Sequence, residues 1–470
     1  MPEPIDWLPD GAPFSPRFGD RYHSSANHGV DQARDAFLGG CGLPAAWAGQ
    51  AQWRILETGF GLGLNFLVTW AAWRADPARP RVLHFVSCEA WPVAAADLLR
   101  AAPQAPELLP LAQQLAAQFW GLLPGVHRLA FEGGQVLLTL YIGDAQTMLR
   151  QQQPVADTVY LDGFSPQCNP DMWSEGLLKA VARCCRRGTR LATWSVASAV
   201  RAGLAQCGFD VRKVPGVPPK RDNLQATFDP PWQPRGAADA PTPLFSAPSR
   251  CVVIGAGLAG AGAAASLARR GWQVQVLDQG AVPAAGASGL PAGVFGLHVS
   301  PDDAPQSRLS RAGLRLTRQT AQDLLTEGVD WAPTGVLEHC VDGKRGLPAA
   351  WSEEATHPGS EWSRYADAAQ LAAAGLPDVA AAAMATCGSG TGLKSGGHLP
   401  VTAAGEICIV HMPHGHGANT DKMFAGVKMA VGRQRQHAAP GQTGPATCLA
   451  GTTVGDQTVG VFAGLGHFPG

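Results

Sequence analysis

Two glycine-rich segments in this chain have a spacing that could serve chemistry, and each follows an apolar run typical of a buried β-strand. The first segment places three glycines at alternate positions, and the second has the spacing GxGxxG. These glycines are Gly59, Gly61 and Gly63 in the first segment, and Gly255, Gly257 and Gly260 in the second. Glycine is favoured where the backbone turns tightly or approaches a ligand closely. The sequence therefore predicts two separate nucleotide-like ligands.

Acidic residues end the strand-like segments that follow the first glycine turn. Glu89 ends "LHFVSCE", 30 residues after Gly59, Asp144 ends "LLTLYIGD", and Asp162 ends "DTVYLD". Ligands of open α/β sheets bind beyond the carboxyl ends of the strands, so these polar strand ends would form one rim. The alternative interpretation is that each acid only caps the helix that follows it. Successive polar strand ends beside a glycine turn favour the cofactor site.

The elements that must position these residues alternate regularly. Strand-like "RILETGF" precedes helical "LNFLVTWAAWRA", and "RLATWS" precedes "VASAVRAGLAQCG". This rhythm predicts a parallel sheet with helices on both faces, an α/β domain over residues 1–229. The proline-rich residues 230–248 are predicted to be a linker. A second βαβ unit opens a domain over 249–384, and residues 385–470, with 18 Gly and no sustained period, are predicted to be an atypical tail.

Composition narrows the class of protein. With 36 Lys and Arg against 37 Asp and Glu, nothing global attracts nucleic acid, so an RNA contact needs a local patch such as "RCCRRGTR" with Lys213, Lys220 and Arg221. The absence of a leader and of a long apolar run predicts a cytoplasmic protein that does not enter membranes. The cluster of Cys408, His411, His414 and His416 fits no standard zinc spacing, so no metal site is predicted.

The first domain resembles a class I S-adenosylmethionine-dependent methyltransferase. The motifs "LETGFGLGLNFL" and "YLDGFSPQCNPDMW", together with "PFSPRFGDRYHSSANHGVDQARDAFLGGCGLPAAW", resemble more specifically the methyltransferase half of the bifunctional tRNA 5-methylaminomethyl-2-thiouridine biosynthesis family. The pattern LDGFxPxxNPxMW of that family is present from Leu161 to Trp173. The resemblance extends from about residue 5 to residue 229.

This resemblance implies S-adenosylmethionine as cofactor and the wobble uridine of a tRNA as partner, with methylation of the aminomethyl nitrogen as the reaction. Asp162 is the expected catalytic residue, Glu89 the partner of the cofactor ribose and Asp144 the partner of the adenine amino group. The expected cofactor-binding residues are Glu57, Gly59, Gly61, Gly63, Asn65, Glu89 and Asp144. The expected substrate residues are Phe164, Asn169, Pro170 and Trp173, with a role in the core as the alternative for Trp173.

The second glycine turn predicts a dinucleotide site. Its GxGxxG lies between a strand and a helix, and Asp278 ends the next strand 23 residues after Gly255, where an acid could hold a ribose. The residues leave FAD and NAD open. The segment "GAGLAGAGAAASLARRGWQVQVLD" resembles glycine-oxidase-type flavoproteins, and "GASGLPAGVFGLHVSPDDAPQSRLSRAGL" resembles the oxidoreductase half of the same tRNA-modifying family. That resemblance implies FAD, contacted by Ser288 and Gly289, although Leu290 stands where the family has Asn.

Together the two resemblances imply consecutive steps on one nucleotide: FAD-dependent removal of a carboxymethyl group, then methylation of the freed amine. Two alternatives stay open, a methyltransferase beside a non-functional flavin-like domain and a two-cofactor enzyme for a small free amine. The resemblance fades near residue 380. We therefore expect a truncated or frame-shifted C-terminal part with weak FAD binding and little oxidase activity, the alternative being a divergent functional cap.

Overall fold

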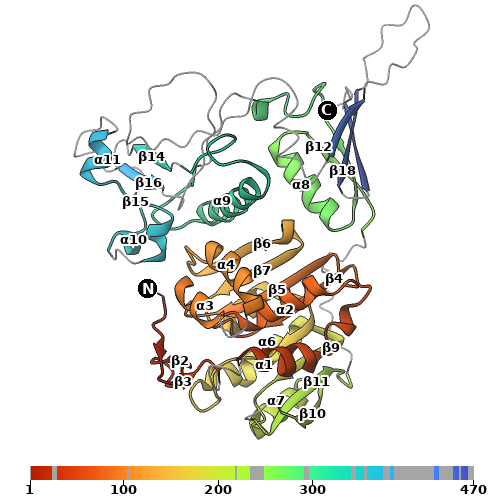
Figure 1. The fold of residues 1–470 in the computed structure, drawn as a ribbon, viewed down its shortest axis with the longest axis vertical. Helices are drawn as coiled ribbons and strands as arrows, with labels where there is room; N and C mark the ends of the chain where they lie inside the picture. The colour runs from red at the N-terminus through yellow and green to blue at the C-terminus, as the bar shows by residue number, and fades with distance from the viewer. Residues whose placement is uncertain are drawn as a thin grey trace, which may run out of the picture. The chain divides into compact units, whose positions relative to one another are not determined.

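The chain forms two compact units, Met1–Leu244 and Phe245–Gly470, which are described separately (Figure 1). The computed structural model describes residues 2–23, 29–102, 106–216, 220–232, 248–289, 296–333, 335–339, 346–353, 357–373, 382–385, 428–432, 448–454 and 457–463.

The first unit is built on an eight-stranded sheet with the order β10-β11-β9-β8-β4-β5-β7-β6. Its strands are β4 (Gln52–Glu57), β5 (Val82–Glu89), β6 (Gly125–Phe131), β7 (Val136–Ile142), β8 (Ala156–Tyr160), β9 (Cys185–Thr193), β10 (Phe209–Pro215) and β11 (Asp222–Phe228). Strand β4 pairs in parallel with β5 on one side and with β8 on the other, so the strand order reverses direction at β4. A separate small sheet consists of β1 (Asp6–Trp7), β2 (Pro13–Ser15) and β3 (Asp20–Arg21).

Helices cover both faces of the large sheet, and each face has its own hydrophobic core. The helices are α1 (Gly29–Asp31), the π-helix η1 (Gln32–Leu38), α2 (Leu64–Ala75), α3 (Ala95–Ala101), α4 (Leu109–Gln118), α5 (Ala145–Gln152), α6 (Glu175–Cys184) and α7 (Ser198–Gln206). One core joins η1, α2 and α4, and the other joins α5, α6 and α7. Because successive strand residues point to opposite faces, Ile55 lies in the first core and its neighbour Leu56 in the second.

The structure confirms the α/β class but corrects the prediction of a wholly parallel sheet. Strand β6 pairs antiparallel with β7, and β11 pairs antiparallel with both β10 and β9. Connections of a few residues between β6 and β7 and between β10 and β11 leave no room for a crossover helix, so these pairs form hairpins. The sequence analysis named no strand at the position of β6.

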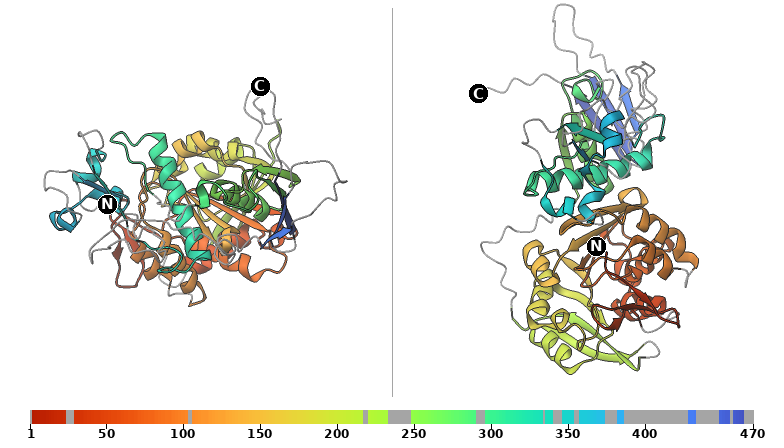
Figure 2. Two further views of the ribbon diagram at one scale, coloured as in Figure 1. Left: turned by 90° about the horizontal axis from the view of Figure 1, so that it is seen from above. Right: turned by 90° about the vertical axis from the view of Figure 1, so that its left-hand side faces the viewer.

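The second unit begins with the predicted βαβ motif, formed by β12 (Arg250–Ile254), α8 (Leu258–Arg269) and β13 (Gln273–Leu277). Its five-stranded sheet has the order β12-β13-β19-β18-β17. The remaining elements are α9 (Pro305–Leu324), β14 (Val336–His339), α10 (Ala349–Glu353), β15 (Arg364–Tyr365), α11 (Ala368–Ala373), β16 (Ala382–Ala385), β17 (Lys428–Gly432), β18 (Cys448–Val454) and β19 (Gln457–Ala463). The blue strands of the tail and the green opening motif share one sheet in Figure 2.

The residues predicted to be an atypical tail therefore contribute three strands, of which β19 pairs in parallel with β13. The sequence analysis expected no element there, because glycines interrupt the short β-branched runs and hide their period. Most of the predicted linker, and the cluster of Cys408, His411, His414 and His416, lie outside the described residues. Among the helices that the structure describes, none combines the length and the apolarity needed to cross a membrane.

Candidate active site

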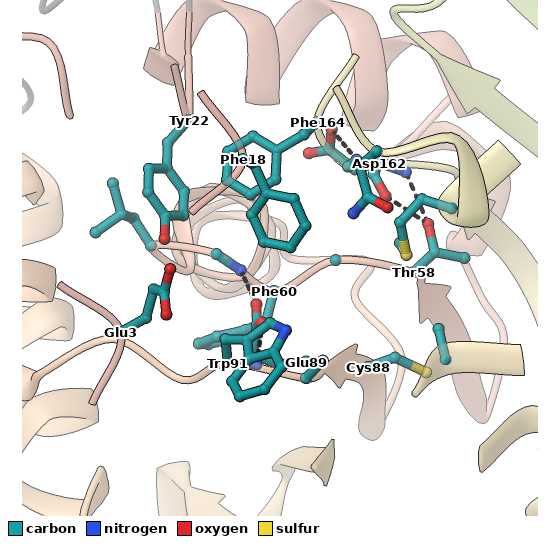
Figure 3. A pocket seen from close by; sticks show the side chains of 18 of the residues that line it. Glu3, Phe18, Tyr22, Thr58, Phe60, Cys88, Glu89, Trp91, Asp162 and Phe164 are labelled. Carbon is teal, nitrogen blue, oxygen red and sulfur yellow. Dashed lines mark hydrogen bonds between the residues drawn. The ribbon is translucent and has the colours of Figure 1, made fainter. Parts of the chain in front are cut away.

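A pocket of about 560 Å³ opens at the carboxyl ends of the central strands of the first unit (Figure 3). It is lined by residues at or just beyond the ends of β4, β5, β7 and β8, including Gly61, Glu89, Asp144 and Asp162. This is the place where the strand order reverses, which is where open α/β sheets bind ligands. The volume lies within the range of small-molecule sites.

The first glycine turn forms one wall of the pocket. Gly61 has φ +51°, and a Cβ built there would lie 3.2 Å from the Tyr22 ring. A Cβ on Gly59 would lie 3.1 Å from the carbonyl oxygen of Asp162. Gly63 has φ +72° and is the residue before α2, but it does not line the pocket. The turn thus needs glycine both for its backbone conformation and for its close approach to Tyr22 and Asp162.

Glu89 is hydrogen-bonded to this glycine turn and to the segment after β5. Its Oε2 accepts a hydrogen bond from the Gly61 amide at 2.8 Å, and its Oε1 accepts one from the Trp91 amide at 2.9 Å. Burial raises the pKa of the Glu89 carboxyl to about 7. Glu89 does not cap the following helix, which begins at Ala95. A carboxylate in this position has acceptor capacity left for the hydroxyl groups of a ribose.

Asp162 is the most constrained acid of the pocket. Its Oδ1 accepts hydrogen bonds from the Gly163 amide at 2.9 Å and from Trp194 Nε1 at 3.0 Å. Its Oδ2 accepts one from Asn65 Nδ2 at 2.8 Å. Burial raises its pKa to about 6, against the lowering effect of these hydrogen bonds. The side chain is thus held in one orientation and is ionised at neutral pH.

Two of the expected cofactor-binding residues, Asn65 and Glu57, form a hydrogen-bonded chain that leads to Asp162. Asn65, which lines the pocket, donates to Glu57 Oε1 at 2.8 Å as well as to Asp162. Glu57 is fully buried, accepts a second hydrogen bond from Ser87 Oγ at 2.6 Å, and does not line the pocket. Burial raises the pKa of Glu57 well above its ordinary value. Glu57 therefore positions Asn65. Its predicted contact with a cofactor stays a prediction, because Glu57 does not line the pocket.

Asp144 combines the two interpretations that the sequence left open. Its Oδ1 caps α5 by accepting the Thr147 amide at 2.7 Å. The residue is exposed and also lines the pocket, beside Gly143. A capping carboxylate keeps a second oxygen, so the cap and a contact with an amino group are compatible.

The expected substrate residues divide into two pairs. Phe164 and Asn169 line the pocket, whereas Pro170 and Trp173 do not. Trp173 is buried, donates its Nε1–H to the Phe164 carbonyl at 2.7 Å and packs edge-on against Trp194. It is therefore a core residue that fixes the Phe164 backbone, which is the alternative that the sequence allowed. Pro170 starts the 3₁₀ turn η7 (Pro170–Trp173).

The sequence analysis missed the aromatic partners of Phe164. Phe18 stacks on Phe164 with ring centroids 4.8 Å apart, and Tyr22 meets it edge-on at 4.9 Å. The three rings gather on one side of the pocket, with Glu89 and Trp91 across from them (Figure 3). These rings could stack on a planar base. The N-terminal motif "PFSPRFGDRYHSS" contained them, but no local period shows that they would meet Phe164.

Several basic residues that the sequence offered to RNA are instead paired within the unit. Arg186 forms an ion pair with Asp157, Arg187 with Asp229, and Lys213 with Asp222. Arg190 donates to the Cys41 carbonyl at 3.1 Å. Lys220 lies over the Trp194 ring, with Nζ 3.2 Å from the centroid. The local basic patch is therefore smaller than the sequence suggested.

The glycine turn of the second unit is tightly packed. Gly255 has φ +101°, and a Cβ on Gly260 would lie 1.8 Å from the Gly255 carbonyl oxygen. Asp278 accepts hydrogen bonds from the Ala256 and Gly280 amides, each at 2.6 Å, and so joins the end of β13 to the turn. Only glycine permits this approach of α8 to the turn, which is the geometry that a bound pyrophosphate requires.

The loop with Ser288 and Gly289 closes on the same turn. Ser288 Oγ accepts the Leu258 amide at 3.1 Å, at the N-terminus of α8. A Cβ on Gly289 would lie 2.2 Å from the Ala284 carbonyl oxygen. Leu290, which departs from the family pattern, lies outside the described residues. The described part of this turn fits the ADP portion of FAD, while the contacts of Asp278, Ser288 and Gly289 with the flavin cofactor stay predictions.

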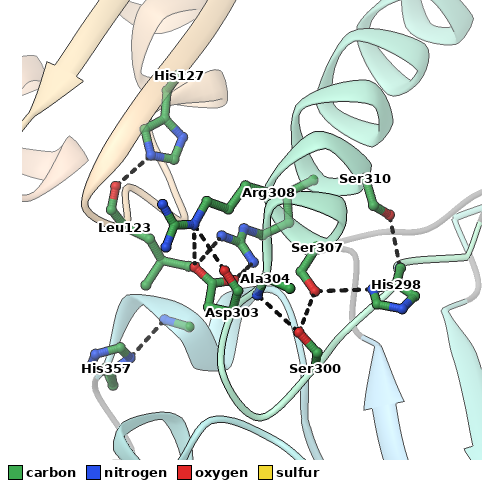
Figure 4. Close-up of polar contacts among 12 residues, drawn as sticks. Leu123, His127, His298, Ser300, Asp303, Ala304, Ser307, Arg308, Ser310 and His357 are labelled. Carbon is green, nitrogen blue, oxygen red and sulfur yellow. Dashed lines mark hydrogen bonds and ion pairs between the residues drawn. The ribbon is translucent and has the colours of Figure 1, made fainter. Parts of the chain in front are cut away.

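A cluster of hydrogen-bonded polar side chains, His298, Ser300 and Ser307, fixes the segment before α9. His298 and Ser300 both bond to the Ser307 hydroxyl, at 3.1 and 3.0 Å, and Ser300 also accepts the Ala304 amide at 3.0 Å (Figure 4). Asp303 pairs with Arg311 of α9. These contacts anchor the segment to the start of α9. Within the described residues, no group of three or more His, Cys, Asp or Glu is placed to hold a metal ion.

Comparison with known proteins agrees with this division of the chain. Residues 106–229 match the family of S-adenosyl-L-methionine-dependent methyltransferases, and residues 250–393 match the family of FAD dependent oxidoreductases. The chain thus contains a methyltransferase domain followed by a flavin-dependent oxidoreductase domain, whose cofactors are S-adenosylmethionine and FAD.

Relatives that are named as bifunctional proteins are similar to most of the chain. The tRNA 5-methylaminomethyl-2-thiouridine biosynthesis bifunctional protein MnmC of Paracidovorax citrulli (strain AAC00-1) is 72% identical over 380 residues, which cover 80% of this chain and 59% of the relative. The protein of the same name from Acidovorax sp. (strain JS42) is 69% identical over 379 residues, 80% of this chain and 58% of the relative. The chain therefore spans less than two thirds of their length.

Among solved structures, MNMC2 from Aquifex aeolicus is 22% identical, with a TM-score of 0.38 over 49% of this chain and 72% of that chain. The resemblance that the motifs indicated is confirmed by the sequence relatives: over 80% of its length, this chain is a homologue of the bifunctional tRNA 5-methylaminomethyl-2-thiouridine biosynthesis proteins.

Proposed function

We propose that the first domain transfers a methyl group to the aminomethyl nitrogen of a wobble uridine in tRNA. The observation that carries the proposal is the geometry of Asp162. Two donors occupy its Oδ1, and its Oδ2, which accepts from Asn65, retains acceptor capacity within the pocket. An amine N–H donated to Oδ2 would place the nitrogen beside the glycine turn.

S-adenosylmethionine, when bound, supplies an electrophilic methyl group on its sulfonium sulfur. The amine lone pair forms the new N–C bond while the C–S bond breaks, and the sulfur keeps that electron pair. The product is a secondary ammonium that keeps both N–H protons of the primary amine and carries the positive charge that the sulfonium gave up, so it must release one proton to become the neutral secondary amine. Asp162, with its pKa raised to about 6, orients the amine by accepting an N–H and can then take this proton toward solvent.

The remaining pocket residues serve binding. Glu89, which accepts the Gly61 amide, would also accept the ribose hydroxyls of the cofactor, and Asp144 would accept the adenine amino group. Phe164, stacked on Phe18, offers a face for the uracil ring. The second domain is proposed to oxidise the carboxymethylaminomethyl side chain with FAD and to release the free amine after hydrolysis of the imine. The ADP portion of FAD would lie on the turn of Gly255, Gly257 and Gly260.

The first test is substitution of the catalytic acid. Asp162→Ala and Asp162→Asn should lower methyl transfer to aminomethyl-tRNA by at least about 100-fold, because the amine loses its acceptor. The nucleosides of digested tRNA are quantified by mass spectrometry. Affinity for S-adenosylmethionine, measured by calorimetry, should change by less than about threefold, since Asp162 acts on the other substrate. The control variant Asp210→Asn changes an exposed acid of β10. Normal turnover by Asp162→Ala would refute the assignment.

The size of the substrate separates this proposal from an enzyme that acts on a small free amine. The same assay with the isolated aminomethyl nucleoside should give a much lower kcat/KM than aminomethyl-tRNA. The tRNA reaction should weaken as salt rises, because phosphate contacts release counterions. Equal kcat/KM for the tRNA and the nucleoside would favour the small-amine alternative.

A further inference from the structure

Lys220 contacts Trp194, which is a hydrogen-bond partner of the proposed catalytic acid Asp162. Its Nζ lies 3.2 Å from the centroid of the Trp194 ring. The indole of Trp194 in turn donates its Nε1–H to Asp162 Oδ1 at 3.0 Å. The Lys220 ammonium thus lies over the Trp194 ring, while the Asp162 carboxylate accepts a hydrogen bond from the indole N–H of the same residue, and the three residues come from different parts of the chain.

The surroundings keep Lys220 charged while removing much of its water. Burial lowers the pKa of the ammonium to about 8, although Asp162 and Asp20 oppose this change. Conversely, Lys220 lowers the pKa of Asp162 against the effect of burial. Glu57 is a further ionisable group beside Asp162: burial raises the pKa of Glu57, and the charges of Asp162 and Glu89 raise it further. Near pH 7 the pair therefore carries one positive and one negative charge.

This pairing resolves a conflict in the chemistry. A buried carboxylate that accepts an amine N–H also stabilises the ammonium form, because opposite charges attract. The ammonium has no lone pair and cannot attack a methyl group. A fixed cation beside the carboxylate opposes binding of the protonated amine and leaves the hydrogen bond available to the neutral one.

We propose that Lys220 is a positioning residue for the methyl transfer: its ammonium, seated on Trp194, offsets the charge of Asp162 so that the substrate amine binds unprotonated. The inference rests on the proposed function of Asp162. It assigns to Lys220 a role that differs from the contact with tRNA phosphates suggested by the sequence. The substrate class it selects is a primary amine in its neutral form.

The test compares Lys220→Met with Lys220→Arg in kcat/KM for aminomethyl-tRNA across pH 6 to 9. On its acid side, the pH profile of kcat/KM rises with pH, and this rise is called the acid limb. In Lys220→Met the acid limb should move up by about one pH unit, so that kcat/KM at pH 6.5 falls by about tenfold. Above the limb, the Met variant should come within about twofold of the unaltered protein, because both Asp162 and the amine are then deprotonated without help. Lys220→Arg retains a charge and should keep the limb near its original position.

A second variant tests the bridge. Trp194→Phe keeps a ring beneath Lys220 but removes the Nε1–H bond to Asp162, so its acid limb should also move upward. Thermal unfolding and affinity for S-adenosylmethionine are measured for every variant, to separate a charge effect from a folding defect.

The outcomes separate this inference from the proposed function. An unchanged acid limb in Lys220→Met, or a rate lowered equally at all pH values, would overturn the role of Lys220 while methyl transfer by the unaltered protein stands. If the unaltered protein itself does not methylate aminomethyl-tRNA, the proposed function has failed, and the inference fails with it.

Discussion

The carboxyl group of Glu89 illustrates how one residue serves binding at a cost to the fold. It accepts two backbone hydrogen bonds from the glycine turn and the segment after β5. Burial raises its pKa from 4.5 to about 7. Because the folded value is the higher one, the stabilising effect of this group is complete below about pH 4.5 and is lost as pH rises through 7. The ionised form needed to hold a ribose is thus the form that the fold disfavours.

Glu89→Ala should weaken binding of S-adenosylmethionine by about 10- to 100-fold, since a charged acceptor is lost. Glu89→Gln should weaken it less, and should raise the melting temperature of the ligand-free protein at pH 8, where the parent carboxylate is ionised. For the unaltered protein, affinity should fall as pH decreases through 7. Calorimetric titration and thermal unfolding provide these values. Unchanged affinity in Glu89→Ala would mean that Glu89 only supports the turn.

At the scale of one element, helix α8 offers a matched pair of glycines. A Cβ on Gly260 would lie 1.8 Å from the Gly255 carbonyl oxygen, whereas a Cβ on Gly262, two residues further along the same helix, meets nothing within 4 Å. The first glycine is required by contact between helix and turn. The second carries only the entropic cost of glycine in a helix.

Gly260→Ala should therefore destabilise the second unit and abolish the weak FAD binding that we expect of it, because α8 must move away from the turn. Gly262→Ala should be neutral or stabilise it by about 0.5–1 kcal/mol. Limited proteolysis reports the stability of the unit, and flavin absorbance after gel filtration with added FAD reports retention. Equal proteolysis and retention in the two variants would contradict a role for close packing at Gly260.

At the scale of the whole molecule, the two units have separate cores and separate sheets. We expect a fragment of residues 1–232 to fold alone and to methylate aminomethyl-tRNA at a rate within about threefold of the full chain, since a unit with its own core can fold independently. Circular dichroism and the nucleoside assay test this expectation. An unfolded or inactive fragment would show that the methyltransferase needs the second unit. Weak FAD retention by the full chain remains our prediction for that second unit.

Features that depend on neighbouring residues could be predicted from the sequence. The strand, glycine turn and helix around Gly59 and around Gly255 are local patterns, and the structure contains both. The rim of acids followed from topology, because parallel strands end at one edge. Glu89 ends such a strand, and Asp144 and Asp162 each lie two residues beyond the end of one. The family resemblance rested on these same segments.

Contacts between segments far apart in the chain were decided only by the tertiary structure. Glu57 and Trp173 belong to the sequence motifs yet do not line the pocket. Glu57 is held in the interior by its hydrogen bond from Asn65, and Trp173 by its hydrogen bond to the Phe164 carbonyl. The sequence suggested that Lys220 is a surface cation, but in the folded protein it lies over the Trp194 ring, which is hydrogen-bonded to Asp162. No local period records such a meeting, since it depends on how the strand ends and the β10–β11 hairpin pack together. The chain alone therefore determined the type of site, and packing decided which side chains surround its reacting nitrogen.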